Sequence, residues 1–105
     1  MLLAVCTTTE TKEEAQAIAR AAVEVKLAAC VHMEEITSLY MWDGKVHEGG
    51  EVRLTMKTAA DAYPALETLI QRLHSYDLPA VYAFEVVKGS AAYLEWVREQ
   101  VAVQE

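Results

Sequence analysis

Two long β-prone runs meet at Asp43-Gly44, and this pair of runs constrains the fold more than any other stretch. Asp-Gly between such runs predicts a tight hairpin turn, because glycine adopts a positive φ without a Cβ clash. The predicted hairpin extends from Cys30 to Thr58, and arms of about 13 residues reach roughly 43 Å. A compact chain of this size measures only about 33 Å across. The hairpin therefore overshoots its own domain, and we expect another subunit to cover its unpaired edges.

Apolar spacing predicts the elements that flank the hairpin. Residues 2–8 are expected to form a buried strand, and Thr11 with Glu14 forms a capping box at the start of a first helix. We expect Asp61 to cap a second helix that has Pro64 in its first turn. The apolar stripes that face the sheet are predicted to comprise Ala15, Ile18, Ala19, Ala22, Val23 and Leu27 in the first helix, and Leu66, Leu69, Ile70 and Leu73 in the second.

The C-terminal part is predicted to contain a loop over 74–79, a strand over 80–87 and a final helix capped by Ser90. Gln104-Glu105 are expected to fray. The order strand, helix, strand, strand, helix, strand, with a helix appended, predicts an α+β fold. Its topology is the ferredoxin-like split β-α-β arrangement, in a single domain of residues 1–105.

A change of apolar parity within the first arm of the hairpin predicts an irregularity there. Alternation is strict in a flat strand, so the shift between Met33 and Ile36 predicts a bulge or bend near Glu34-Glu35. Gly49-Gly50 predicts a second break in the other arm. We therefore expect a bent ribbon that wraps around a neighbouring subunit.

Charge and cysteine content narrow the class of protein. A formal net charge of −7 argues against nucleic acid and against an anionic membrane as partners. The chain has two cysteines, and the sequence after Met1 lacks a secretory signal, which predicts reduced thiols and a cytoplasmic location. No apolar run has the length of a transmembrane helix.

Several spaced motifs between about Val5 and Val97 resemble those of the CutA family, the divalent-cation tolerance proteins. They are Leu27-Ala28-Ala29-Cys30-Val31, Ser38-Leu39-Tyr40-Met41-Trp42-Asp43-Gly44, Glu51, Lys57-Thr58, His74-Ser75-Tyr76-Asp77-Leu78-Pro79, and Gly89 followed by Tyr93-Leu94-Glu95-Trp96. The resemblance implies a homotrimer in which strands of one subunit extend the sheet of the next. It also implies a PII-like assembly and a role in tolerance of copper and other divalent metals.

The loop over 74–79 departs from the family pattern in two places. Ser75 replaces a proline and Ala80 replaces a glutamate that would face a cleft between subunits. Chemistry that depends on that carboxylate is therefore not expected of this chain.

Cys6 and His74 are the candidate metal ligands, and the resemblance carries copper binding onto both positions. Thiolate and imidazole suit Cu(I), Cu(II) or zinc, so copper or another divalent cation is the expected cofactor. Cys30 and His32 lie at i and i+2 on one face of a strand and form a possible additional pair. The alternative is that both cysteines are small core residues, because no metal-ligand spacing such as C-x-x-C occurs, and that His32 and His47 face solvent.

The candidate cleft residues are Tyr40, Trp42, Glu51, Lys57, His74 and Tyr76. Aromatic walls with a few polar groups suit a pocket for a small anionic metabolite. The alternative is subunit packing, because Tyr and Trp are enriched at protein interfaces.

Enzyme classes are disfavoured. The loop after the first strand, Thr7 to Glu10, lacks the arginine of the small acylphosphatases, and no phosphate-cradling glycine loop occurs. Three hypotheses stay open: a copper-binding trimer in metal tolerance, a small-metabolite binding module, and a structural trimer without a ligand.

Overall fold

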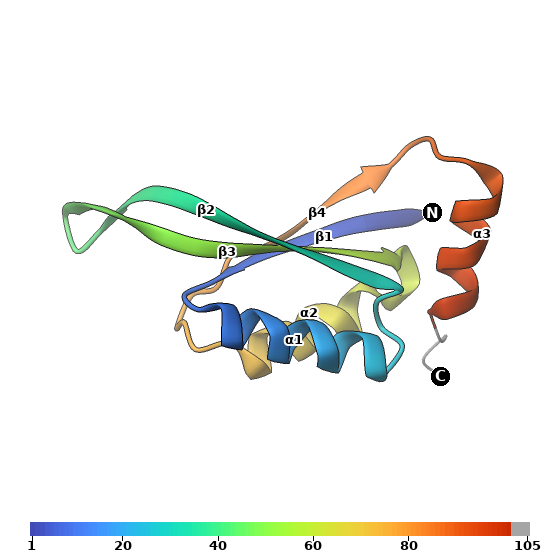
Figure 1. The fold of residues 1–105 in the computed structure, drawn as a ribbon, viewed down its shortest axis with the longest axis horizontal. Helices are drawn as coiled ribbons and strands as arrows, with labels where there is room; N and C mark the ends of the chain where they lie inside the picture. The colour runs from blue at the N-terminus through green and yellow to red at the C-terminus, as the bar shows by residue number, and fades with distance from the viewer. Residues whose placement is uncertain (102–105) are drawn as a thin grey trace.

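A computed structural model describes residues 1–101, and its elements follow the predicted order. The elements are β1 (Leu2–Thr9), α1 (Lys12–Glu24), β2 (Cys30–Trp42), β3 (Lys45–Ala59), the single-turn η1 (Ala60–Ala62), α2 (Tyr63–Leu73), β4 (Val81–Val86) and α3 (Ala91–Gln100). The strands form one antiparallel sheet in the order β2-β3-β1-β4. Helices α1 and α2 lie on one side of the sheet and α3 lies at its end near the N-terminus (Figure 1). The predicted α+β class and split β-α-β topology are confirmed.

The hairpin forms as predicted and projects beyond the rest of the chain (Figure 1). Asp43 has φ 53° and Gly44 has φ 73°, the left-handed values that a two-residue turn of type I′ requires. The molecule extends 45 × 27 × 21 Å along its principal axes, so the ribbon makes it much longer than it is wide.

Of the bulge or bend predicted near Glu34-Glu35, the bulge is wrong, and so is the predicted break at Gly49-Gly50. The β2–β3 register runs without interruption from Cys30 opposite Lys57 to Trp42 opposite Lys45. Residues 45–50 are exposed, and strict burial alternation in β3 begins only where the strand reaches the body of the molecule. No buried face enforces apolar parity in the outer half of the ribbon, so parity changes there while the pairing stays regular and the ribbon twists (Figure 1).

The core lies between the sheet and the two helices. Its fully buried large side chains include Val5 of β1, Leu54 and Met56 of β3, and Ile18 and Ile70 of the helices. Strand β1, between β3 and β4, is buried as expected, whereas β4 is an edge strand and leaves Tyr82 and Phe84 exposed.

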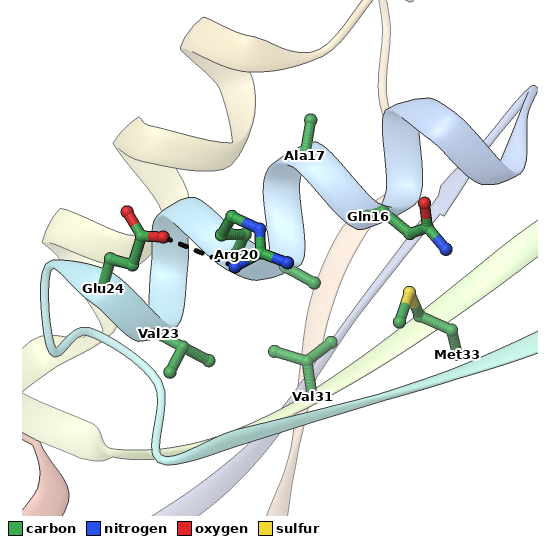
Figure 2. Close-up of a pocket in the computed structure, with 8 residues that line it drawn as sticks. Gln16, Ala17, Arg20, Val23, Glu24, Val31 and Met33 are labelled. Atoms are coloured by element: carbon green, nitrogen blue, oxygen red, sulfur yellow. Dashed lines mark ion pairs between the residues drawn. The ribbon is translucent and has the colours of Figure 1, made fainter.

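Two members of the predicted helical stripes are exposed instead: Val23 at 42% and Leu73 at 43%. Both lie at the C-terminal ends of their helices. Val23 faces a hollow of about 740 Å³ between α1 and the edge strand β2, together with Val31 and Met33 (Figure 2). Arg20 and Glu24 form an ion pair of 3.8 Å at the helical rim of this hollow (Figure 2). Val23 is exposed because β2 is an edge strand, and no element within residues 1–101 covers its unpaired edge.

Two of the three predicted N-cap side chains make their hydrogen bond, but the predicted capping box is only half formed, because the Glu14 carboxylate bonds Ser75 instead of Thr11. Thr11 Oγ1 accepts a hydrogen bond from the Glu14 N–H at 3.1 Å, and Ser90 Oγ accepts one from the Tyr93 N–H at 3.3 Å. The predicted Asp61 cap is wrong, because Asp61 lies inside η1 and the N-cap position of α2 is Ala62, without a side-chain bond. The predicted fraying of Gln104-Glu105 lies outside the described residues. Within residues 1–101, no helix combines the length and the apolar character needed to cross a membrane.

Candidate functional site

A cleft of about 500 Å³ lies where the outer part of the hairpin meets the end of β1 and the loop after α2. Four of the six predicted cleft residues, Tyr40, Trp42, Glu51 and Tyr76, line this cleft, whereas Lys57 and His74 are not among its lining residues. The remaining lining residues are Thr8, Ser38, Leu39, Asp77, Leu78 and Ala80. The hairpin supplies the aromatic wall because Tyr40 and Trp42, two positions apart in β2, lie on the same face of the strand.

Tyr76 forms the best-defined polar contact of the cleft. Its hydroxyl donates to Glu51 Oε2 at 2.9 Å, and its ring packs on the His74 ring with centroids 4.9 Å apart. Burial raises the pKa of Tyr76 well above its usual value of about 10, and the hydrogen bond to Glu51 and the negative charge of Glu51 and Glu10 add to the shift. The phenol is therefore held protonated as a donor to the Glu51 carboxylate.

The hairpin side of the cleft is ordered by an aromatic stack near its tip. The Tyr40 and His47 rings are stacked with centroids 5.7 Å apart and an interplanar angle of 14°. His47 Nε2 lies 3.2 Å from the Trp42 carbonyl oxygen, which ties the two arms together close to the turn.

The structure places Lys57 away from this cleft. Lys57 is paired with Cys30 of β2 and Ala4 of β1. It lies six residues beyond Glu51 on β3, a separation of roughly 20 Å along an extended strand. Among the residues that line the cleft, two are carboxylates, Glu51 and Asp77, and none is Lys or Arg.

Cys6 lies on the face of the sheet opposite α1 and α2. Its register partners are Thr55 of β3 and Tyr82 of β4, whereas its neighbour Val5 points into the core. The Cys6 side chain is buried at 5% exposure, and Sγ lies 4.0 Å from Thr55 Oγ1. The Cys6 thiol is therefore buried, but outside the core cluster between the sheet and the helices.

The His74 side chain is buried at the start of the loop after α2, with both ring nitrogens in hydrogen bonds. Nε2 lies 2.8 Å from the Thr8 carbonyl oxygen, and Nδ1 accepts the Tyr76 N–H at 3.2 Å. This pattern places the proton on Nε2 and leaves neither nitrogen with a free lone pair. A metal at His74 would therefore have to displace one of these bonds.

The possible additional pair lies further along the same open face. Cys30 is half-buried with Sγ 3.6 Å from the Tyr93 hydroxyl, and His32 is exposed opposite Thr55. His32 and His47 are both exposed, as the solvent-facing alternative expects. Within residues 1–101, no group of three or more His, Cys, Asp or Glu side chains is arranged to hold a metal ion.

Sequence reasoning missed one pair of residues beside the cleft, Glu14 and Ser75. The Glu14 carboxylate accepts hydrogen bonds from both the backbone N–H and the hydroxyl of Ser75. The spacing Thr11 to Glu14 indicated only a local capping box. Nothing in a local pattern identifies a contact between residues that are 61 positions apart.

Known proteins with similar sequences and structures place the chain in a family. The model of the CutA1 divalent ion tolerance proteins matches residues 3–100. A divalent-cation tolerance protein CutA of Thermus thermophilus is 41% identical over 88% of this chain and 90% of its own length. The human protein CutA is 44% identical over 81% of this chain, but the match spans only 48% of the human protein.

A solved structure shows that the similarity extends from the sequence to the fold. The structure described as the periplasmic divalent cation tolerance protein CutA from Archaeoglobus fulgidus has a TM-score of 0.95 and 31% identity, covering 97% of this chain and all of that one. The family model covers most of the chain, and the relatives share both its sequence and its fold. The chain therefore belongs to the CutA1 divalent ion tolerance family.

Proposed function

We propose that this protein acts in divalent-metal tolerance as a cytoplasmic homotrimer that binds its ligands without catalysing a reaction. Membership of the family supports the metal-tolerance role. The observation that carries the assembly is the projecting hairpin. Near its tip Leu39, Met41 and Val46 are each exposed by 64–67%, and Tyr40 and Trp42 by about half. Apolar side chains this dense on an exposed ribbon mark an interaction surface.

The two free edges of the sheet support the same assembly. Strands β2 and β4 each have one unpaired side within the described chain, and β4 carries exposed Tyr82 and Phe84. An unpaired edge with apolar flanks favours pairing with another strand. In the proposed trimer, the hairpin of one subunit extends the sheet of the next and covers these edges.

Copper binding through Cys6 and His74 is the proposed chemical basis of the tolerance role. The two residue types suit copper, and Cys6 lies on the open face of the sheet, where copies of the subunit would meet. Release of His74 Nδ1 from Tyr76, or of Nε2 from Thr8, would supply the imidazole ligand.

Titration of Cu²⁺ into the protein tests this proposal. The double variant Cys6→Ser/His74→Ala should lose at least tenfold in copper affinity. The matched control is Cys30→Ser/His32→Ala, which removes the same two side-chain types from the other candidate pair and should leave the affinity unchanged. Equal affinities of the wild type and the Cys6/His74 variant would refute direct ligation by this pair.

A second candidate function is binding of a small anionic metabolite in the cleft, in the manner of PII proteins. The aromatic cleft of about 500 Å³ favours it. Because Lys57 lies far from the cleft of its own subunit, the proposal requires a cation from a neighbouring subunit. Thermal-shift screening of anionic metabolites tests it, since a ligand at 100 times its Kd stabilises the folded state by about 2.7 kcal/mol. If both the copper and the metabolite experiments gave negative results, the remaining hypothesis would be a structural trimer that binds no ligand.

A further inference from the structure

Glu14 makes a contact that its position in a helix does not require. Its backbone N–H completes the N-terminal cap of α1 with Thr11 Oγ1. A capping box would return the carboxylate to the N-cap residue, but this carboxylate extends to the loop after α2. Oε2 accepts the Ser75 N–H at 2.7 Å and Oε1 accepts the Ser75 hydroxyl at 3.0 Å. Both oxygens thus hold one residue, and the Glu14 side chain is only 15% exposed.

The residues on either side of Ser75 are held as well. His74, with a fully buried side chain, is bonded through Nε2 to the Thr8 carbonyl at the end of β1. The Tyr76 N–H donates to His74 Nδ1, and the two rings pack together. His74 is therefore bonded to the end of β1, Ser75 to the first turn of α1, and Tyr76 to His74. Tyr76, the third of these consecutive residues, lines the cleft.

Tyr76 completes the line of contacts through its hydroxyl bond to Glu51 Oε2 at 2.9 Å. The backbone of this loop lies in neither a helix nor a strand, so side-chain bonds decide its position. We infer that Glu14 and Ser75 are positioning residues of the cleft: they clamp the loop that holds Tyr76 against Glu51. The inference depends on contacts within the metal-free subunit, among them the two His74 bonds of which the proposed copper ligation would have to displace one.

The clamp makes a local prediction that a general stabilising role does not. Glu14→Gln keeps the shape of the side chain and the backbone cap but removes the negative charge and one of the two acceptor oxygens, so the Ser75 N–H and hydroxyl can no longer each donate to a carboxylate oxygen. Ser75→Ala removes the hydroxyl and keeps the N–H, and Ser75→Thr keeps both donors. The matched control is Glu13→Gln, which removes the same charge from the same helical turn at an exposed position.

Amide hydrogen exchange measured by NMR on the full chain tests the clamp. Protection of the Ser75 and Tyr76 amides should fall at least tenfold in Glu14→Gln and less in Ser75→Ala, while Ser75→Thr and Glu13→Gln keep wild-type values. The β1 and β3 amides should change no more than in Glu13→Gln. Unchanged protection at Tyr76 in Glu14→Gln, or an equal loss across the whole sheet, would overturn the inference.

A second readout reports on the cleft itself. Trp42 and Tyr76 both line the cleft, and in a Trp96→Phe background Trp42 is the one remaining tryptophan of the chain. Its acrylamide quenching constant should rise in Glu14→Gln toward the value of Tyr76→Phe, which breaks the Glu51 bond directly. Identical quenching in Glu14→Gln and Glu13→Gln would contradict a positioning role, whatever the outcome of the copper and metabolite experiments.

Discussion

Thr7 offers the sharpest test of how the core is built, because its hydroxyl is buried without a partner. The Thr7 side chain in β1 is 0% exposed, opposite Leu54 of β3 and Val81 of β4. Within residues 1–101, its Oγ1 is the buried side-chain polar atom that makes no hydrogen bond. Thr7→Val exchanges this hydroxyl for a methyl group of nearly the same volume. We therefore expect the substitution to stabilise the protein.

The size of the effect follows from the cost of an unsatisfied hydroxyl. Burying such a group costs about 1–3 kcal/mol, and replacing it with an apolar group of the same shape recovers that cost. Valine and threonine both favour strands, so backbone preference changes little. We expect a gain of about 1–2 kcal/mol in the free energy of unfolding, with a rise of roughly 4–8 °C in Tm per kcal/mol.

Thr58→Val is the matched control, because Thr58 is equally buried but has a partner. Its hydroxyl donates to the Leu27 carbonyl oxygen at 2.7 Å. Removing this donor should cost about 1–2 kcal/mol. Urea denaturation of both variants at one fixed protomer concentration measures the two effects with comparable m-values. If Thr7→Val proved neutral or destabilising while Thr58→Val behaved as expected, the reasoning about the Thr7 hydroxyl would be refuted.

Three further predictions concern a cap, an ionisable group and the interface. Ser90→Ala removes the side-chain cap of α3 and should cost about 1 kcal/mol, so an unchanged Tm would count against the cap. Because the folded state raises the pKa of Tyr76, its contribution to stability is complete below about pH 10 and is lost as pH rises further. Tyr76→Phe should therefore show a shallower loss of stability above pH 10 in urea titrations, and an identical slope would speak against the shift. Tyr40→Ala/Trp42→Ala removes exposed aromatic surface at the hairpin tip and should weaken the trimer by a few kcal/mol per site, so light scattering that finds undiminished assembly on dilution would rule out their packing role.

Local chemistry predicted the framework of this fold well. The Asp43-Gly44 turn, the capping residues Thr11 and Ser90, and the apolar spacing of the helices each depend on neighbours within a few positions. Two of the errors, at Val23 and in β2, arose where burial is decided by distant elements, whereas the wrong Asp61 cap is a local error, because Asp61 lies inside η1. Val23 has the helical spacing of a core residue, but it faces the hollow between α1 and the edge strand β2. The change of apolar parity in β2 reflects exposure of the ribbon and not a bulge.

The candidate site was predictable only in part, and through resemblance rather than spacing. Tyr40, Trp42, Glu51 and Tyr76 meet at one cleft, although the chain separates Glu51 from Tyr76 by 25 positions. Lys57 does not join them, because register fixes it at the other end of β3. The bonds that occupy His74 could not be predicted, since they depend on how the loop after α2 lies against β1.

The central claim is that the hairpin requires other copies of the chain to cover it. Sedimentation equilibrium on the purified protein at micromolar protomer concentration tests that claim most directly. We predict a single species of about three times the subunit mass of 11.7 kDa. A species of 11.7 kDa throughout that concentration range would contradict it.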